Sequence, residues 1–299
     1  MKVSTSTSNI VSRFGHETAM NIFGEAGFEA LDYGMFHLAP DGELFAKSDD
    51  AEFADYFKKV RKMAADNGLE IGQTHAPFPL KVYDDRDPVF LACAIRSIYA
   101  TAHLDCPYVV IHPGMKPAFI YGMNYEECKR TNVEFYSAMV PAIRETGVRV
   151  AIENMFAGDP ETHKLIPTTC STAAWMIDLI DTLNDIHGEE LFVACLDTGH
   201  AIISGSGATN MLLELGARTK TLHVQDNDGL SDMHQIPGRG KINWQRFLDG
   251  LKTVGYSGTF NFEADNFYHQ WSADIYGEPV ARAAARTLYT VGRTFADQL

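Results

Sequence analysis

The sequence has little positive charge and no segment suited to crossing a membrane. Lysine and arginine total 25 against 39 acidic residues, so the formal net charge is −14. A surface of this sign repels phosphate backbones, and no run of basic residues offsets it, so we expect no nucleic-acid partner. No apolar run approaches the roughly 18 residues that span a bilayer, and the first residues lack the apolar core of a signal peptide. We therefore expect a cytoplasmic protein without a membrane partner.

Cysteine is also scarce, and one nucleotide-binding motif is missing. The chain has five cysteines, an odd number, and none forms a Cys-x-x-Cys pair. This usage is typical of reduced residues in a cytosolic protein. No Gly-x-Gly-x-x-Gly motif follows the first apolar segment, so a dinucleotide-binding α/β fold lacks its signature.

The sequence does contain short β-rich runs that alternate with amphipathic stretches. Apolar residues spaced three and four apart predict helices over 52–66 and 244–254, and a last helix is expected over about 279–297. Gly147 and Gly255 follow helical stretches, at points where glycine suits a helix C-cap. The eight candidate strands cover residues 2–9, 28–33, 69–74, 108–111, 148–152, 192–196, 221–224 and 258–262.

Strands that alternate with helices favour a parallel sheet. Eight such units, without a linker or a low-complexity segment, predict an α/β protein that is a single-domain (β/α)8 TIM barrel over residues 1–299. A doubly wound open sheet is the alternative. The longer connections all follow strands, on the side where barrel enzymes build their active sites. They cover residues 156–170, 200–208, 226–242 and 265–278.

Ionisable side chains stand at the ends of the last six predicted strands. A single histidine there is more often structural than functional, but six ionisable positions in succession would converge on one mouth of a closed barrel. Buried carboxylates and imidazoles are costly unless they are paired or bind a cation. Their mixture suits Mn, Co, Mg or Zn, and the lack of cysteine among them argues against a structural zinc site. The residues are His75, His112, Glu153, Asp197 with His200, His223 and Glu263.

The segments around these residues resemble the xylose isomerase-like barrel superfamily, which contains sugar epimerases and isomerases and also the endonuclease IV type of nuclease. The resemblance covers nearly the whole chain. It is carried by Ile152-Glu153-Asn154, Leu196-Asp197-Thr198-Gly199-His200, His223-Val224-Gln225-Asp226-Asn227-Asp228-Gly229 and Pro237-Gly238-Arg239-Gly240-Lys241-Ile242-Asn243-Trp244.

In the ketose 3-epimerases of this superfamily, four side chains on strands five to eight hold one divalent ion, and two glutamates among them move protons on opposite faces of the substrate. The resemblance therefore implies an isomerase or epimerase that acts on a ketose or sugar derivative through a metal-stabilised enediolate. Its catalytic residues would be Glu153 and Glu263, and its ion would be Mn, Co or Mg. The implied metal ligands are Glu153, Asp197, His223 and Glu263. The expected substrate contacts are His75, His112, His200, His234 and Arg239.

The loop after strand seven departs from the epimerase pattern. The epimerases carry a substrate-binding arginine where this sequence has His234, preceded by Asp232. Endonuclease IV relatives use an Asp-x-His pair in this loop for a third zinc ion, together with histidines after strands three and four. Zinc and additional ions are therefore open alternatives, and so is a trinuclear zinc nuclease. The additional ligands would be His75, His112, Asp232 and His234.

Two further alternatives remain open from the sequence. A lyase or dehydratase that acts on a keto-sugar or keto-acid would use the same metal site and enolate chemistry. A non-catalytic sugar-binding barrel would have no need of both Glu153 and Glu263. The resemblance also implies a small-molecule carbohydrate as the partner, and a homodimer or homotetramer, which relatives commonly form.

Overall fold

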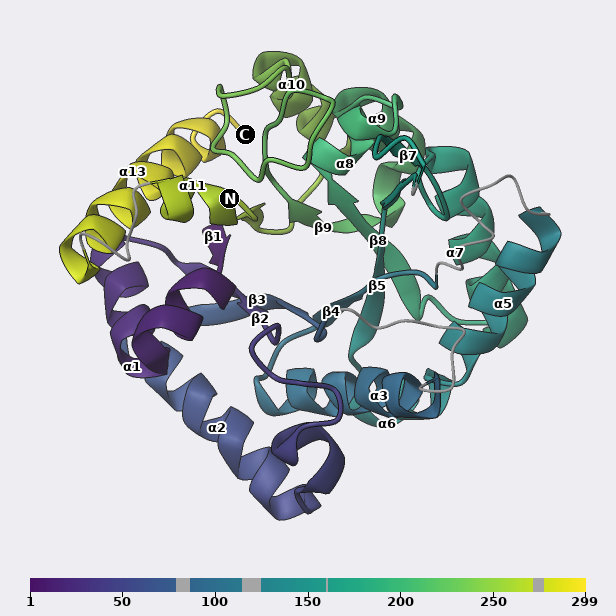
Figure 1. Cartoon of the computed structure of the whole chain (residues 1–299), viewed down its shortest axis with the longest axis horizontal. Helices are drawn as coiled ribbons and strands as arrows, with labels where there is room; N and C mark the ends of the chain where they lie inside the picture. The colour runs from purple at the N-terminus through teal and green to yellow at the C-terminus, as the bar shows by residue number, and fades with distance from the viewer. Residues whose placement is uncertain (79–86, 115–124, 160, 271–276) are drawn as a thin grey trace.

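The computed structural model describes residues 1–299 except 79–86, 115–124, 160 and 271–276. At its centre lies a parallel sheet of eight strands in the order β10-β1-β2-β3-β4-β5-β8-β9. A parallel bridge between Val224 and Phe262 joins the two ends of this sheet. The strands therefore close into a barrel, which Figure 1 shows in a view along its axis. The predicted (β/α)8 TIM barrel is confirmed.

The strands of the barrel fall on the eight predicted runs, with ends that differ by up to three residues. Each strand is followed by a helical segment before the next strand begins, as the alternation predicts. The strands are β1 (Val3–Ser6), β2 (Ala30–Gly34), β3 (Glu70–His75), β4 (Tyr108–Ile111), β5 (Arg149–Glu153), β8 (Phe192–Asp197), β9 (Thr219–His223) and β10 (Phe260–Phe262).

Helices surround the barrel. Those of the described residues are α1 (Ser8–Ala26), α2 (Asp50–Asp66), α3 (Asp87–His103), α5 (Tyr125–Ser137), α6 (Val140–Thr146), α7 (Ala173–His187), α8 (Thr198–Ile203), α9 (Ala208–Leu215), α10 (Trp244–Val254), α11 (Asp265–Gln270) and α13 (Glu278–Ala296), with single turns η1 (Glu43–Lys47) and η2 (Gly216–Arg218). None of them combines the length and the apolar character needed to cross a bilayer.

Helix α10 shows how the apolar spacing produces the outer layer. Its Phe247, Leu248 and Leu251 recur on one face and are buried, and each such side chain contributes about 1.5–3 kcal/mol through removal from water. The helix ends at Gly255, whose φ of 66° is the left-handed conformation that glycine adopts without strain. The predicted helix over 244–254 is confirmed at both ends.

The first strand is shorter than predicted. β1 ends at Ser6, and α1 begins at Ser8, inside the predicted strand 2–9. Thr7 already has helical dihedral angles (φ −93°, ψ −18°), and its carbonyl oxygen accepts from the backbone N–H of Val11 at 2.9 Å. The β-branched composition favours an extended chain here, but the helical hydrogen bond prevails. As a result Ser8 and Asn9 leave the strand and lie at the mouth of the barrel.

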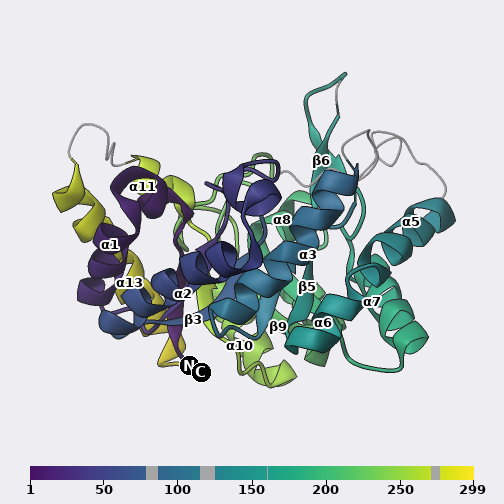
Figure 2. The same cartoon turned by 90° about the horizontal axis from the view of Figure 1, so that it is seen from below.

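The connection that we predicted over 156–170, after β5, contains secondary structure of its own. It contains a two-stranded antiparallel hairpin, β6 (Phe156–Gly158) and β7 (Leu165–Pro167). Figure 2 shows this hairpin projecting from the molecule at the end opposite the two chain termini. The projecting end is therefore the C-terminal end of the strands, where the candidate residues lie.

The interior of the barrel is divided between apolar and polar side chains. Val110, Ala151, Val193 and Cys195, on β4, β5 and β8, form a small buried cluster separate from the main core beneath the helices. Side chains alternate across each strand, so this cluster faces inward while its sequence neighbours face the helices. On β2, β3 and β10 the buried residues include Asp32, Gln73 and Asn261.

Candidate metal centre

Four of the predicted side chains converge at the mouth of the barrel. Glu153, Asp197 and His223 are the last residues of β5, β8 and β9, and Glu263 directly follows β10. One ligand-type atom from each of the four lies within 4.8 Å of the others, and all four residues are buried. His223 lies between the two glutamates, because its Nδ1 is 3.0 Å from Glu153 Oε1 and 3.1 Å from Glu263 Oε2.

A second group adjoins the first through a shared glutamate. His75, His112 and Glu153 also place ligand-type atoms within 4.8 Å of one another. Nε2 of His112 is 2.9 Å from Glu153 Oε2, and Nε2 of His75 is 3.4 Å from the same oxygen. The aromatic ring of Phe36 packs edge-on against His75, with ring centroids 4.6 Å apart. The two histidines thus form the wall of the mouth next to β3 and β4.

A third group lies on the other side of the mouth. Asp232 Oδ2 is 2.9 Å from Nε2 of His234, and Asp232 Oδ1 is 3.6 Å from Nε2 of His200. These three side chains also meet within 4.8 Å. The structure therefore brings together all nine ligand-type positions that the sequence suggested. Arg239 is different: its side chain is exposed, and it does not join these groups in the described structure.

Three of these histidines have a fixed orientation. In each ring Nδ1 lies within hydrogen-bonding distance of a backbone carbonyl oxygen. Because a carbonyl only accepts, Nδ1 carries a proton, and each ring presents its Nε2 lone pair to the cluster when it is neutral. Metal-binding histidines are commonly held in this way. The pairs are His75 with Ala76 (2.8 Å), His200 with Asn154 (2.9 Å) and His234 with Glu263 (2.9 Å).

Two of the sequence motifs, Ile152-Glu153-Asn154 and Leu196-Asp197-Thr198-Gly199-His200, are joined by hydrogen bonds beside these ligands. The Asn154 side chain donates to the carbonyl oxygen of Asp197 (2.9 Å) and accepts from its backbone N–H (2.7 Å). The Asp197 carboxylate accepts from the backbone N–H of His200 (2.6 Å) and so caps α8. A Cβ atom at Gly199 would lie 2.3 Å from the side-chain amide of Gln225, so a larger residue here would have to displace that amide.

The loop that carries Asp232 and His234 is organised by another buried carboxylate, Asp226. Asp226 accepts from the backbone N–H of Gly238 (2.9 Å) and from the indole N–H of Trp244 (3.0 Å). These contacts tie the loop after β9 to the start of α10. The third ligand group therefore stands on a supported segment, although it lies outside the strands.

The electrostatics of the cluster call for a cation. Asp197 Oδ2 and Glu153 Oε2 are buried and make no hydrogen bond of normal geometry to any residue that the structure describes. Burial, opposed by His200 and reinforced by the charge of Glu153, raises the pKa of Asp197 to about 7. Four carboxylates lie in the cluster: Glu153, Asp197, Asp232 and Glu263. Within the described residues, all their ion pairs are with histidines, and none is with lysine or arginine. Buried carboxylate oxygens that lack a hydrogen bond of normal geometry and lie beside imidazole nitrogens fit a divalent ion.

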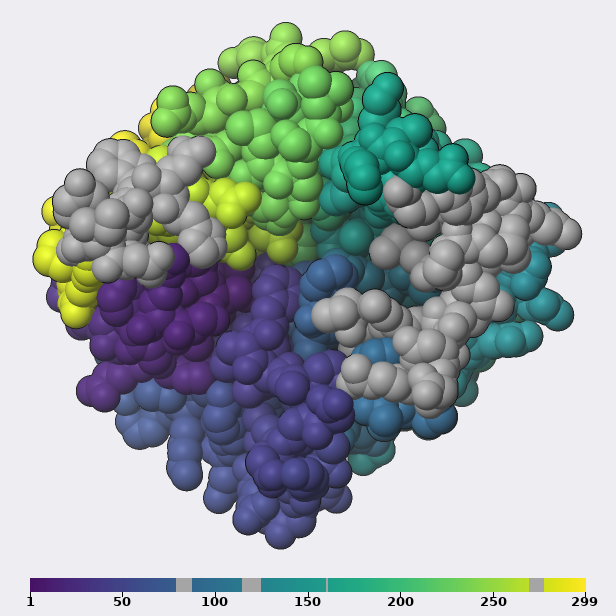
Figure 3. All heavy atoms as spheres, in the orientation of Figure 1, coloured from purple at the N-terminus to yellow at the C-terminus, as the bar shows by residue number. Residues whose placement is uncertain are grey.

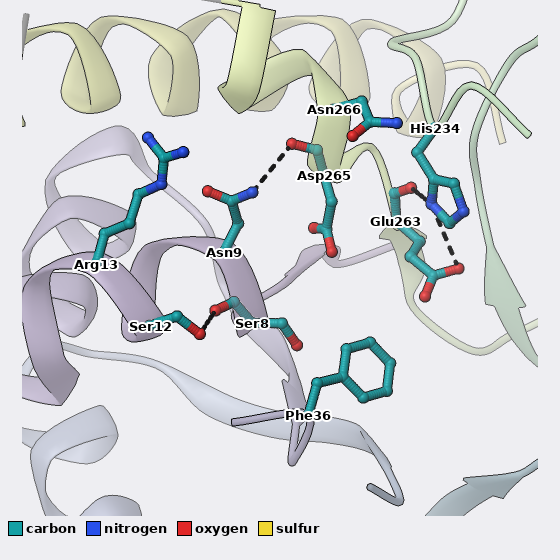
Figure 4. Close-up of a pocket in the computed structure, with 9 residues that line it drawn as sticks. All are labelled: Ser8, Asn9, Ser12, Arg13, Phe36, His234, Glu263, Asp265 and Asn266. Carbon is teal, nitrogen blue, oxygen red and sulfur yellow. Dashed lines mark hydrogen bonds and ion pairs between the residues drawn. The ribbon is translucent and has the colours of Figure 1, made fainter. Parts of the chain in front are cut away.

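A cavity of about 460 Å³ opens beside Glu263 and His234. Seen from the mouth, the described surface is hollowed near its centre, between the β9 loop in green and the β2 segment in purple (Figure 3). Figure 4 shows how the residues from α1 and from the start of α11 face each other across this cavity. The other lining residues are Ser8, Asn9, Ser12, Arg13, Phe36, Asp265 and Asn266.

Our reading of the sequence missed this part of the site, because Ser8 and Asn9 fell inside the predicted strand 2–9. The hydroxyl of Ser8 is buried and has no hydrogen-bond partner among the described residues. It lies so close to Gly34 that a Cβ atom there would collide with it. An earlier end to the first strand would have placed these polar residues after a strand, like the other candidates.

The family is now established by comparison with known proteins. The chain belongs to the xylose isomerase-like TIM barrel family, whose profile matches residues 24–290. The sequence is 27% identical over 199 residues to inosose isomerase from Halalkalibacterium halodurans, a match that spans 64% of this chain and 64% of that protein.

Solved structures agree with this assignment at the level of the fold. The IOLI protein with a binding zinc atom has a TM-score of 0.72 at 17% identity, over 99% of this chain and 98% of that chain. D-psicose 3-epimerase with D-tagatose, from Clostridium cellulolyticum H10, has a TM-score of 0.70 at 15% identity, over 98% and 99% of the two chains. At these identities the similarity establishes a shared barrel.

Proposed function

We propose that this protein is a divalent metal-dependent isomerase or epimerase that acts on a ketose or a related sugar derivative. The main observation behind the proposal is that a carboxylate oxygen of Glu153 and one of Glu263 both contact the same imidazole nitrogen of His223, beside an open cavity. Membership of the family, together with similarity to inosose isomerase and to D-psicose 3-epimerase, supports a sugar as the substrate.

Two carboxylates at one centre suit proton transfer on a sugar. One of Glu153 and Glu263 would take the proton from the carbon beside the carbonyl group, and the other would return a proton from the opposite side. A bound divalent ion would polarise the carbonyl and its neighbouring hydroxyl and so favour the enediolate. The ligands of that ion would be Glu153, Asp197, His223 and Glu263. The substrate oxygens would be contacted by His75, His112, His200 and His234.

The two adjoining groups could hold additional ions. His75 and His112 share Glu153 with the four-ligand group, and Asp232 stands between His200 and His234. For a single ion we expect Mn, Co or Mg, whereas occupation of all three groups would suit zinc. Arg239 remains a predicted substrate contact, which requires its exposed side chain to turn toward the mouth.

A second candidate function is hydrolysis of a phosphodiester by three zinc ions, as in endonuclease IV. One observation favours it: all three ligand groups are complete in this chain. The net charge of −14 opposes it, since binding of a nucleic acid depends on neutralisation of its phosphates. We therefore rank this function below the sugar isomerase.

Exchange of hydrogen with solvent tests the proposed reaction. Full-length protein loaded with Mn²⁺, Co²⁺, Mg²⁺ or Zn²⁺ is incubated in D₂O with a panel of free ketoses and inososes, and the sugars are analysed by NMR. We expect deuterium at a carbon beside the carbonyl group, together with a new stereoisomer or positional isomer. Loss of water from the sugar would instead indicate a lyase.

The other candidates predict different results in the same assays. Cleavage of an abasic-site duplex without exchange into any sugar would favour the nuclease. Sugar binding without exchange, by protein that is folded and loaded with metal, would indicate a non-catalytic barrel and overturn the proposal. The variant Glu70→Gln is a matched control, because Glu70 is an exposed glutamate at the other end of the barrel.

A further inference from the structure

His223 is oriented differently from the other histidines of the cluster. It turns Nδ1, not Nε2, toward Glu153 and Glu263. On the far side of the ring, Nε2 lies 3.2 Å from Oδ2 of Asp32, which stands on β2. Both residues are buried, with exposed fractions of 0% for His223 and 2% for Asp32. Within the described residues this contact is an ion pair that does not meet hydrogen-bond geometry, and Nε2 makes no other hydrogen bond.

The carboxylate of Asp32 is held in place by two side-chain amides. Its Oδ2 accepts from Nε2 of Gln73 and from Nδ2 of Asn261, each at 3.0 Å. The same two amides also donate to the carbonyl oxygen of Leu222, at 3.3 Å and 3.2 Å. Leu222 directly precedes His223, so the network joins Asp32 to the strand that carries the histidine.

We infer that Asp32 is a positioning residue that aims Nδ1 of His223 at the metal centre. Nδ1 can bind a cation only when the proton of the neutral ring lies on Nε2. An acceptor beside Nε2 favours that tautomer and holds the plane of the ring, and a carboxylate also increases the basicity of the nitrogen that faces the metal. For His75, His200 and His234 a backbone carbonyl serves the same purpose at the opposite nitrogen.

A purely structural role explains the network less well. Gln73 and Asn261 need only an acceptor, which a neutral amide would supply without the cost of a buried charge. The ion pair that the described structure gives to Asp32 is with His223, not with lysine or arginine. A buried carboxylate kept against one imidazole is better explained if the charge acts on that imidazole.

The test measures the affinity of the protein for Zn²⁺. This inference rests on the proposed role of His223 as a metal ligand, so variants of both residues are compared. Zn²⁺ is titrated into metal-stripped, full-length protein in competition with a chromogenic chelator. We expect Asp32→Asn to weaken the tightest Zn²⁺ binding about 10–100-fold. The matched control Asp249→Asn, at an exposed position on α10, should bind like the wild type.

The outcomes separate the two claims. If His223→Ala binds Zn²⁺ like the wild type, the proposed ligand set fails. If His223→Ala loses tight binding but Asp32→Asn keeps wild-type affinity, the role of Asp32 alone is overturned. A measurement on the wild type avoids any folding defect: in Zn²⁺-loaded protein with ¹⁵N-labelled histidine, the Nε2 proton of His223 should exchange slowly and resonate downfield. A rapidly exchanging Nε2 proton would contradict the inference.

Discussion

The two ends of the barrel carry charge in different ways. At the N-terminal end, Lys2 pairs with Glu70 and Arg293 with Glu29, in ion pairs between partly exposed side chains of opposite sign. At the mouth, buried carboxylates meet histidines instead. The cavity at the N-terminal end is the larger one, about 840 Å³ against about 460 Å³. Cavity size would therefore favour the N-terminal end as the site, whereas the state of the buried charges favours the mouth.

The difference has a thermodynamic basis. Each exposed ion pair is complete in itself and contributes about 0–1 kcal/mol. The carboxylates of the mouth have no such balance, since one oxygen of Asp197 has no hydrogen-bond partner in the described part of the chain. A cation that binds there should stabilise the protein and take part in its chemistry. The same kind of substitution should therefore have a large effect at the mouth and a small one at the N-terminal end.

Loss of one carboxylate at the mouth should have the largest effect. Glu153→Gln and Glu263→Gln each remove a proton-transfer group, so turnover should fall by a factor of about 10²–10⁴. Glu70→Gln, the same chemical change at the N-terminal end, should leave turnover unchanged. Steady-state kinetics on the sugar that shows deuterium exchange would check this. A Glu263→Gln enzyme of full activity would contradict the two-carboxylate mechanism.

Removal of the metal should have the next largest effect, on stability. An ion present at 100 to 1,000 times its dissociation constant adds about 2.7–4.1 kcal/mol to the free energy of unfolding. Urea unfolding with and without a chelator measures this difference. The variant Lys2→Met should lose the same amount on chelation, because its substitution lies at the other end. An equal unfolding free energy in both conditions would show that the mouth holds no cation.

Acid should also destabilise the protein through a histidine outside the three ligand groups. Nε2 of His16 is 2.8 Å from the hydroxyl of Tyr33, and burial together with His37 lowers the pKa of His16 to about 4. The unfolded chain, with an ordinary pKa near 6.5, binds a proton more readily, so stability is lost as the pH falls from about 6.5 to 4. Because His16 is partly exposed, we expect the free energy of unfolding to fall by only about 1 kcal/mol. Metal-free His16→Gln protein should show a flatter unfolding profile over this range.

The smallest effect should come from the ion pairs of the N-terminal end. Lys2→Met breaks the pair with Glu70 and should change the free energy of unfolding by no more than about 1 kcal/mol. Metal content and turnover should stay at wild-type values. Thermal unfolding with parallel metal analysis checks both points. A loss of metal in this variant would contradict the claim that metal binding depends on the mouth and not on the N-terminal end.

The sequence could predict the barrel and its ligands because both follow local patterns. Each strand is a short β-rich run, and Glu153, Asp197 and His223 end such runs, so closure of the barrel brings them together. The β6–β7 hairpin has no such run, since its strands have three residues each. Arg239 was assigned from its motif, whereas its exposure depends on the path of a loop.

Asp32 shows a different limit. It lies inside a run that reads as an ordinary buried strand, and nothing next to it in the sequence indicates a partner. Only the closed barrel brings β2 under the end of β9, with Gln73 and Asn261 from two other strands around the same carboxylate. Contacts between side chains that point inward from different strands depend on register and shear, which local patterns do not contain.

The central claim is that the mouth of the barrel is a divalent metal centre. Its most direct test is the metal content of purified, metal-loaded protein by mass spectrometry, for the wild type and for the Asp232→Ala/His234→Ala double variant. We predict at least one tightly held divalent ion per chain in the wild type, and retention of the ion at the four-ligand group in the double variant. Two or three zinc ions in the wild type, partly lost in the variant, would favour the trinuclear alternative. A folded wild-type protein that retains no divalent ion would contradict the account.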